Sequence, residues 1–116
     1  MQARRRLVSR WNLLAERLMA DRSVQRMVKL VNPQGFHARP AHMFMKLASQ
    51  YSASVEILKG NEIINGKSIL DLLTLGAVNG TTLCLRAIGD DAQAAVDALS
   101  ELIESGFGEM PGQAPS

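Results

Sequence analysis

The chain has 116 residues, 47% of them hydrophobic and 21% charged, which is enough apolar material for one modest core and too much for a disordered chain. A single cysteine, Cys84, excludes an internal disulfide and a cysteine-based metal cage, and no apolar stretch approaches the roughly 20 residues that span a bilayer. Residues 1–25 hold six arginines against two acids, whereas residues 26–116 hold seven basic and nine acidic residues, so the net charge of +2 does not indicate a nucleic-acid-binding protein.

The first 25 residues predict an arginine-rich amphipathic helix. Leu7, Trp11, Leu14 and Leu18 recur at helical spacing, and charged residues interrupt any apolar core long enough for a secretory signal. Three roles remain open for this extension: a helix that docks on the domain or on a partner, a helix on a membrane surface, or the product of a translation start upstream of Met27. A weaker alternative, nucleic-acid binding through the arginines, predicts an affinity that falls with salt.

Residues 27–31 predict a short β-strand, and residues 38–50 predict a helix with one apolar stripe. Between them the chain runs Gly-Phe-His-Ala-Arg-Pro-Ala from Gly35. This glycine permits a turn with positive φ, and Pro40 is tolerated only in a first helical turn. The pattern therefore predicts that His37 caps the start of the helix.

The start of a helix suits a histidine that carries phosphate. The first amides of a helix have no intrahelical partner, and the helix dipole adds positive charge there, so an anion is stabilised without a metal. His37 would supply a neutral imidazole nitrogen as the nucleophile, and Arg39 would hold phosphate oxygens with its guanidinium group. A lone histidine is more often an ordinary surface residue, but the surrounding heptapeptide favours the chemical role.

Metal chemistry has no support in the sequence. His42 follows His37 by five residues, which places the two side chains about 140° apart around a helix, so we expect His42 to face solvent. The chain has no phosphate-binding loop of the Walker type, no HExxH pattern and no paired cysteines, and we expect no metal or other cofactor. Cys84 is expected to pack on a strand.

The middle of the chain predicts a hairpin and a short helix. Residues 54–59 alternate between apolar and polar side chains, and Gly60-Asn61 leads into residues 62–65, so the two runs predict antiparallel strands. Residues 68–75 are compatible with two helical turns that begin at Ser68, a natural N-cap.

The last two elements complete a β-α-β-β-α-β-α order. Residues 81–88 alternate again, and a helix with a clear apolar stripe opens at Asp90 and Asp91 and ends before Gly106. This order predicts an α+β fold in which the helices cover one side of an antiparallel sheet and the other side faces solvent. On the last strand the side chains expected to face the core are Leu83, Leu85 and Ala87.

Two segments resemble the histidine-containing phosphocarrier family HPr of the bacterial phosphoenolpyruvate-dependent sugar phosphotransferase system. Residues 32–41, Asn-Pro-Gln-Gly-Phe-His-Ala-Arg-Pro-Ala, resemble its active-site signature, and residues 65–70, Asn-Gly-Lys-Ser-Ile-Leu, resemble its regulatory segment. The resemblance implies the HPr open-faced β-sandwich, with a four-stranded sheet and three helices on one face, in a domain of residues 26–108. The extension 1–25 has no counterpart in the family, and residues 109–116 are expected to form a flexible tail.

The resemblance also implies a function. Phosphorylated enzyme I would donate a phosphoryl group to Nδ1 of His37, and a sugar-specific acceptor domain of the IIA type would remove it, so that the protein is a cytoplasmic relay intermediate and not a stand-alone enzyme. Arg39 and the amides after His37 would share the charge of the transferring group. We expect no nucleic-acid partner and no membrane insertion. The alternative is a regulatory paralogue in a nitrogen-related branch, which acts through phosphorylation-dependent partner binding.

The regulatory segment and the docking surface are implied in the same way. A dedicated HPr kinase/phosphorylase would phosphorylate Ser68, whereas the alternative is that this serine is only an N-cap. Asp71 departs from the glycine common in the family, and we expect its charge to change some partners. The residues implied to dock partners, which the alternative places in the core, are Phe36, Ile69, Leu70 and Leu73.

Overall fold

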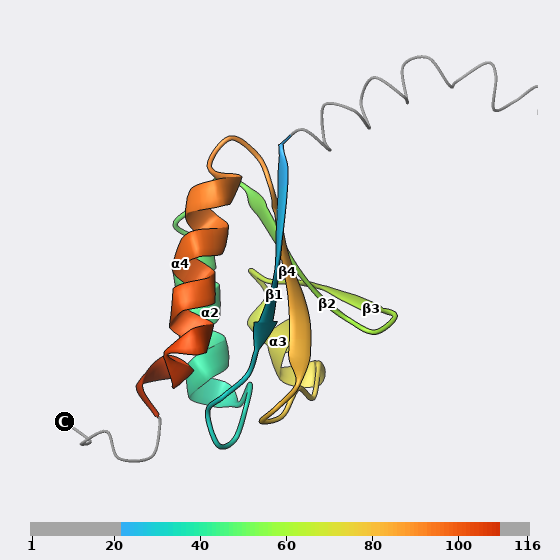
Figure 1. Ribbon diagram of the computed structural model, residues 1–116, viewed down its shortest axis with the longest axis vertical. Helices are drawn as coiled ribbons and strands as arrows, with labels where there is room; N and C mark the ends of the chain where they lie inside the picture. The colour runs from blue at the N-terminus through green and yellow to red at the C-terminus, as the bar shows by residue number, and fades with distance from the viewer. Residues whose placement is uncertain (1–21, 110–116) are drawn as a thin grey trace, which may run out of the picture.

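In the computed structural model, residues 22–109 are described and form one antiparallel sheet with helices packed on one of its faces (Figure 1). The predicted helix of the extension and residues 110–116 of the predicted tail lie outside the described residues. In chain order the elements are β1 (Ser23–Lys29), α2 (Ala38–Ala48), β2 (Ser54–Lys59), β3 (Glu62–Asn65), α3 (Ile69–Thr74), β4 (Thr82–Ile88), α4 (Ala92–Glu104) and the 3₁₀ turn η1 (Gly106–Gly108).

The sheet has the strand order β1-β4-β2-β3, and every neighbouring pair is antiparallel. The register places Val28 of β1 opposite Leu83 of β4 and Ile57 of β2 opposite Leu85. Because successive side chains of a strand point to opposite faces, this register gathers the apolar positions on one side. Leu83, Leu85 and Ala87 are fully buried there, which confirms the predicted core face of β4.

Strand β1 differs from the prediction at both ends. It begins at Ser23, four residues before the predicted start at Met27, and it ends at Lys29 instead of Val31. Its length is set by pairing along all seven residues of β4, from Thr82 to Ile88, and not by its own apolar residues. The sheet therefore includes three residues that the sequence pattern assigned to the extension.

Helices α2 and α4 lie side by side over the buried face of the sheet (Figure 1). The side chains of Ala41, Phe44 and Ala48 on α2 are fully buried, as are those of Leu99 and Ile103 on α4. Each large apolar side chain removed from water in this way contributes about 1.5–3 kcal/mol. The short helix α3 packs on α2 and β3, and its Leu72 joins the same core.

The opposite face of the sheet is open to solvent. Arg86 of β4 binds Glu56 of β2 at 2.6 Å on this face, and Met27 of β1 is 64% exposed. Cys84 is half-buried there and faces away from the core. One covered face and one open face define the open-faced sandwich that the resemblance implies, within the α+β class that the sequence pattern predicts. Among residues 22–109, no helix has both the length and the apolar character required to cross a bilayer.

Candidate functional site

His37 is the N-cap of α2, as the sequence predicts. Its backbone is extended (φ −104°, ψ −168°), and its carbonyl accepts the first helical bond, from the amide of Ala41, at 2.9 Å. The ring makes no capping hydrogen bond to the helix, and the side chain is 35% exposed. Because Pro40 has no N–H, the amides of Ala38 and Arg39 are the donors at this end of the helix that lack an intrahelical carbonyl.

The loop before His37 is held close to the loop that follows α3. Gly35 has φ +62°, and a Cβ at this position would lie 2.4 Å from the carbonyl oxygen of Ala77. The amide of Phe36 donates to that same oxygen at 3.1 Å, and the amide of His37 donates to the carbonyl of Gly35 at 3.0 Å. Only glycine has both the left-handed backbone and the space for this approach, so Gly35 determines where the histidine is placed.

Phe36 supports this loop from the interior. The ring lies 5.6 Å from the ring of Phe44 and 5.6 Å from the ring of Phe107, in edge-on and tilted arrangements. Only 5% of the residue is exposed, so it offers a partner little surface. This burial favours the alternative, in which Phe36 belongs to the core and supports the loop, over a docking role.

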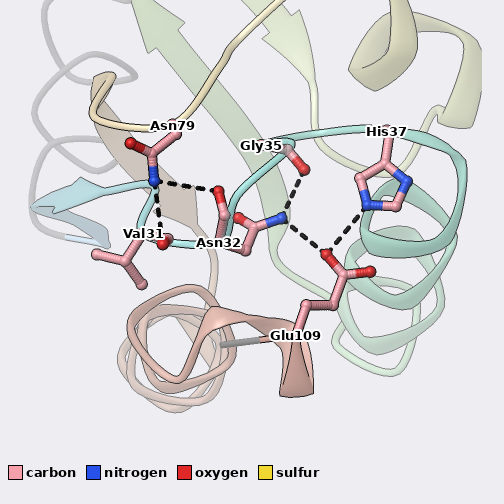
Figure 2. Close-up of polar contacts among 6 residues, drawn as sticks. All are labelled: Val31, Asn32, Gly35, His37, Asn79 and Glu109. Atoms are coloured by element: carbon pink, nitrogen blue, oxygen red, sulfur yellow. Dashed lines mark hydrogen bonds and ion pairs between the residues drawn. The ribbon is translucent and has the colours of Figure 1, made fainter. Parts of the chain in front are cut away.

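The sequence pattern missed one residue of the site, Glu109. Its Oε1 atom lies 3.0 Å from Nε2 of His37, 72 residues away along the chain (Figure 2). The same oxygen accepts a hydrogen bond from Nδ2 of Asn32 at 3.0 Å. The sequence predicts a flexible tail from residue 109 onward, whereas the carboxylate of Glu109 is only 21% exposed and lies against one side of the histidine ring.

Asn32 connects the two sides of the site (Figure 2). It is fully buried, and its Nδ2 donates to the carbonyl of Gly35 at 2.8 Å as well as to Glu109. Its own backbone carbonyl accepts a hydrogen bond from Asn79 at 3.2 Å. Because both neighbours of Nδ2 are acceptors, the orientation of the amide is defined by its partners. Oδ1 is buried without a hydrogen-bond partner among the described residues.

Hydrogen bonds are the main reason that Glu109 stays ionised. Burial raises the pKa of the Glu109 carboxyl, but the hydrogen bonds from His37 and Asn32, followed by electrostatic attraction to His37 and Arg39, lower it by more. The net pKa lies below the ordinary value of 4.5, so the group is a carboxylate near neutral pH. Glu109 therefore presents a negative charge and only hydrogen-bond acceptors to the histidine ring.

Arg39 and the surface next to His37 are accessible. Arg39 is exposed, and none of the ion pairs formed within residues 22–109 includes it. A depression of about 260 Å³ beside the histidine is lined by Pro33, Gln34, His37 and Glu109. The guanidinium can therefore turn toward an anion at the start of α2, and the ring can be reached from solvent. The structure brings His37, Arg39 and the first amides of α2 to one end of the molecule.

Ser68 caps α3, as the sequence predicts. Its Oγ accepts a hydrogen bond from the amide of Asp71 at 3.2 Å. The carboxylate of Asp71 in turn accepts the amide of Asn65 at 3.1 Å, so it fastens the end of β3 to the helix. The hydroxyl of Ser68 is half-buried and already has a structural partner.

Three of the four residues expected to dock partners are exposed. The exposed fractions are 37% for Ile69, 67% for Leu70 and 41% for Leu73, whereas Leu72 between them is fully buried. Helix α3 thus turns one apolar residue into the core and leaves three outside. It contacts α2, and Figure 1 shows it near the end of the molecule at which α2 begins. An exposed apolar group of this kind suits a protein contact.

No metal centre is formed by the described residues. Within residues 22–109 no three side chains of histidine, cysteine, aspartate or glutamate gather closely enough to hold an ion. His42 is exposed on α2, as expected, and does not join His37.

Comparison with known proteins gives a family match over most of the chain. Residues 24–105 match the family model described as "PTS HPr component phosphorylation site". Phosphocarrier protein HPr of Neisseria meningitidis serogroup A is 39% identical over 82 residues, which cover 71% of this chain and 92% of that protein. Phosphocarrier protein NPr of Shewanella violacea is 37% identical over 86 residues, which cover 74% of this chain and 94% of that protein.

A solved structure and a larger relative extend the comparison. The crystal structure of HPr-C-His from Thermoanaerobacter tengcongensis superposes with a TM-score of 0.73 at 40% identity, and the match covers 75% of this chain and 98% of that one. The multiphosphoryl transfer protein of Haemophilus influenzae is 34% identical over 90 residues, which cover 75% of this chain but only 18% of that protein. The match thus includes nearly the whole Thermoanaerobacter chain, but only a small part of the Haemophilus protein.

Proposed function

The chain belongs to the HPr family of phosphocarrier proteins, and from this premise we propose that His37 accepts a phosphoryl group from phosphorylated enzyme I and passes it to a sugar-specific acceptor domain of the IIA type. The observation that carries the proposal is the position of the histidine. It caps α2 without using its ring for the cap, and Nδ1 has no hydrogen-bond partner among the described residues. The relay would operate in the cytoplasm, where we place enzyme I and the acceptors.

The transfer needs no proton to move at His37. The lone pair of Nδ1 forms a bond to phosphorus while the bond between phosphorus and the donor breaks, and the electron pair of that bond stays with the donor. The onward step reverses this with the acceptor. The amides of Ala38 and Arg39 and the guanidinium of Arg39 would stabilise the negative oxygens of the transferring group.

Partner docking is proposed for the exposed apolar residues of α3. Enzyme I and the acceptor domains must each bring a reacting atom in line with Nδ1, which requires a contact surface beside the histidine. Ile69, Leu70 and Leu73 provide exposed apolar side chains on a helix that packs against α2. Asp71 adds a negative charge to this helix and would weaken the binding of partners that present acidic groups there.

Replacing the histidine tests the proposal. Incubation with enzyme I and phosphoenolpyruvate should place acid-labile phosphate on the wild-type chain and none on His37→Ala. His42→Ala is the matched control, because it changes the other histidine of the same helix, which is exposed and outside the site. Phosphate on His37→Ala, or its absence from the wild type, would contradict the proposal.

Regulation through Ser68 is a separate part of the proposal. A phosphate on this serine would add about two negative charges at the start of α3, next to the docking residues, and would repel acidic partners. An HPr kinase/phosphorylase is the proposed enzyme. After incubation with the kinase, mass spectrometry should map one phosphate to Ser68 of the wild type. Ser68→Ala should carry none. If the wild type stays unmodified, the serine is only a cap.

A second candidate function is a regulatory one in a nitrogen-related branch. The similarity to NPr of Shewanella violacea, which extends over 94% of that protein, favours it. In this case the phosphorylation state of His37 would determine which partner the protein binds. Rapid transfer to sugar-specific acceptors supports the relay, whereas a stoichiometric complex with a non-sugar enzyme supports the regulatory role.

A further inference from the structure

Glu109 and Asn32 form a support for the histidine ring that comes from outside the helix start. We propose that Glu109 is a positioning residue for phosphoryl transfer: it holds the His37 ring with its hydrogen on Nε2 and balances the positive charge that the ring gains when Nδ1 bonds to phosphorus. This inference rests on the proposed function and deepens it, because it concerns the same histidine.

The geometry of the contact selects one tautomer of the neutral ring. A carboxylate can only accept hydrogen bonds, so a contact of 3.0 Å between Oε1 of Glu109 and Nε2 of His37 requires the hydrogen to be on Nε2. The lone pair of the neutral imidazole is then on Nδ1. Figure 2 shows that the ring presents Nε2 to Glu109, which leaves the other nitrogen turned away from the carboxylate. Glu109 thereby makes Nδ1 the nucleophile.

Asn32 holds the carboxylate in this position. Its Nδ2 donates to Oε1 of Glu109 at 3.0 Å and to the carbonyl of Gly35 at 2.8 Å, so one buried amide links the carboxylate to the loop that carries the histidine. The amide cannot swing away without leaving a buried donor unpaired. Glu109 is thus oriented in part by a group that does not react.

The backbone conformation after α4 places Glu109 next to His37. Gly106, Phe107 and Gly108 have φ of +74°, +56° and +75°, and this left-handed run turns the chain back from the end of the helix. Phe107 is a non-glycine residue in this conformation, which carries a strain that the surrounding structure must offset. Its buried ring packs on Phe36, one residue before the histidine. The turn that carries Glu109 is therefore packed against the loop that carries His37.

The charge of Glu109 is used in the phosphorylated state. When the Nδ1–phosphorus bond forms, the ring keeps its Nε2 hydrogen and becomes positively charged next to the carboxylate. In the onward step the bond to phosphorus breaks, its electron pair returns to Nδ1, and a neutral imidazole leaves. A ring that had lost the Nε2 hydrogen would have to leave as an anion, which is a far poorer leaving group. The aspartate of a Ser-His-Asp triad supports its histidine by the same two effects, tautomer and charge.

Two substitutions of Glu109 separate the effects. Glu109→Ala removes both the acceptor and the charge, whereas Glu109→Gln retains an oxygen that can accept from Nε2 and removes only the charge. The readouts are the ring tautomer, from ¹⁵N NMR of the unphosphorylated protein, and kcat and KM for phosphorylation by enzyme I. Glu104→Ala is the matched control, since Glu104 is an exposed glutamate at the end of α4.

The expected results differ between the variants. In Glu109→Ala the Nε2–H form should lose its predominance, and kcat should fall by about 10- to 100-fold, a loss of the size seen when the hydrogen-bond partner of a metal-binding histidine is removed. KM should stay within about twofold, because the residue acts on the ring and not on the partner. Glu109→Gln should recover the tautomer and part of the rate, and Glu104→Ala should match the wild type.

The outcomes distinguish this inference from the proposed function. A wild-type tautomer or a wild-type kcat in Glu109→Ala would overturn the role of Glu109 while leaving His37 as the phosphoryl acceptor. A wild-type chain that enzyme I does not phosphorylate would overturn the proposed function, and the NMR measurement would still show whether Glu109 sets the tautomer. Thermal melting of the variants shows whether any loss of rate comes from unfolding.

Discussion

Two helices of this protein begin at residues that could carry phosphate, and the two helix starts are built differently. At α3, the Oγ of Ser68 accepts the amide of Asp71 at 3.2 Å, and Asp71 adds a carboxylate to the first turn. At α2, the ring of His37 makes no capping bond, and the first turn has no acidic residue. The ring contacts Glu109 from another part of the chain instead.

The difference lies in which donors at the two helix starts are already used. The side-chain oxygen and the carboxylate at α3 already satisfy an amide and the positive end of the helix dipole. At α2 the amides of Ala38 and Arg39 keep their capacity for an anion, because nothing in residues 22–109 caps them with a side chain. We therefore expect substitutions at the start of α2 to affect transfer and those at the start of α3 to affect stability.

The largest expected effect belongs to the glycine that places the α2 start. Gly35→Ala would put a Cβ 2.4 Å from the carbonyl oxygen of Ala77 at a φ of +62°. We expect the free energy of unfolding to fall by about 3 kcal/mol, measured by chemical denaturation. Gly76→Ala, after α3, is the matched control, since φ is +67° and nothing lies within 4 Å of its Cβ. It should lose only about 1 kcal/mol. Equal losses would show that the close approach at Gly35 has no importance.

The next largest effect concerns charge at the α2 start. Arg39→Ala should slow phosphorylation by enzyme I by about tenfold to 100-fold, because it removes a cation from the transferring group, while the melting temperature stays the same since the side chain is exposed. Arg39→Lys should give an intermediate rate, because lysine keeps the charge without the planar fork. Arg26→Ala, in the ion pair with Asp97 on β1 and α4, serves as control. A wild-type rate in Arg39→Ala would contradict the assignment.

The matching substitution at the α3 start should act on stability. Ser68→Ala removes the capping oxygen, and we expect it to lower the free energy of unfolding by about 1 kcal/mol. The rate of transfer through His37 should not change, because the hydroxyl takes no part in it. Ser68→Asp retains a capping acceptor and should recover the stability, and it should slow transfer if negative charge on α3 regulates docking. A slower phosphoryl transfer in Ser68→Ala would contradict the expectation that the α3 start affects stability and not transfer.

The smallest effect is expected at a third helix start, that of α4. The Asp91 carboxylate accepts the amides of Ser52 and Ala53 at 2.9 and 2.8 Å, and these backbone hydrogen bonds are the main cause that lowers its pKa below the ordinary 3.8. A pKa lowered on folding stabilises the protein above the unfolded value and loses this contribution as the pH falls through the folded value. Melting temperature should therefore fall more steeply with acid in the wild type than in Asp91→Asn. Parallel curves would contradict this expectation.

Local pattern was sufficient to place most elements and the histidine. The alternation of Leu83, Leu85 and Ala87 identifies the core face of β4, and the glycine, proline and apolar stripe around His37 identify the start of α2. Both signals depend on residues within a few positions of one another. They could be interpreted without knowledge of the rest of the chain, and the structure agrees with them.

The parts that local pattern missed depend on distant contacts. Glu109 meets His37 across 72 residues, and the burial of Phe36 depends on Phe107 in the same C-terminal turn. The signal that could have been used is the apolar Phe107 between two glycines directly after α4, which favours an anchored turn over a tail. Strand β1 was placed too late because its length comes from pairing with β4.

The sequence by itself determined the α+β order, the buried face of the sheet and the histidine at a helix start, since these follow from periodicity and backbone preference over short distances. Only the tertiary structure decided which groups surround that histidine. Asn32 and Glu109 become a support for the ring because the fold brings the loop before α2 against the turn after α4, and buried polar groups there must find one another as partners.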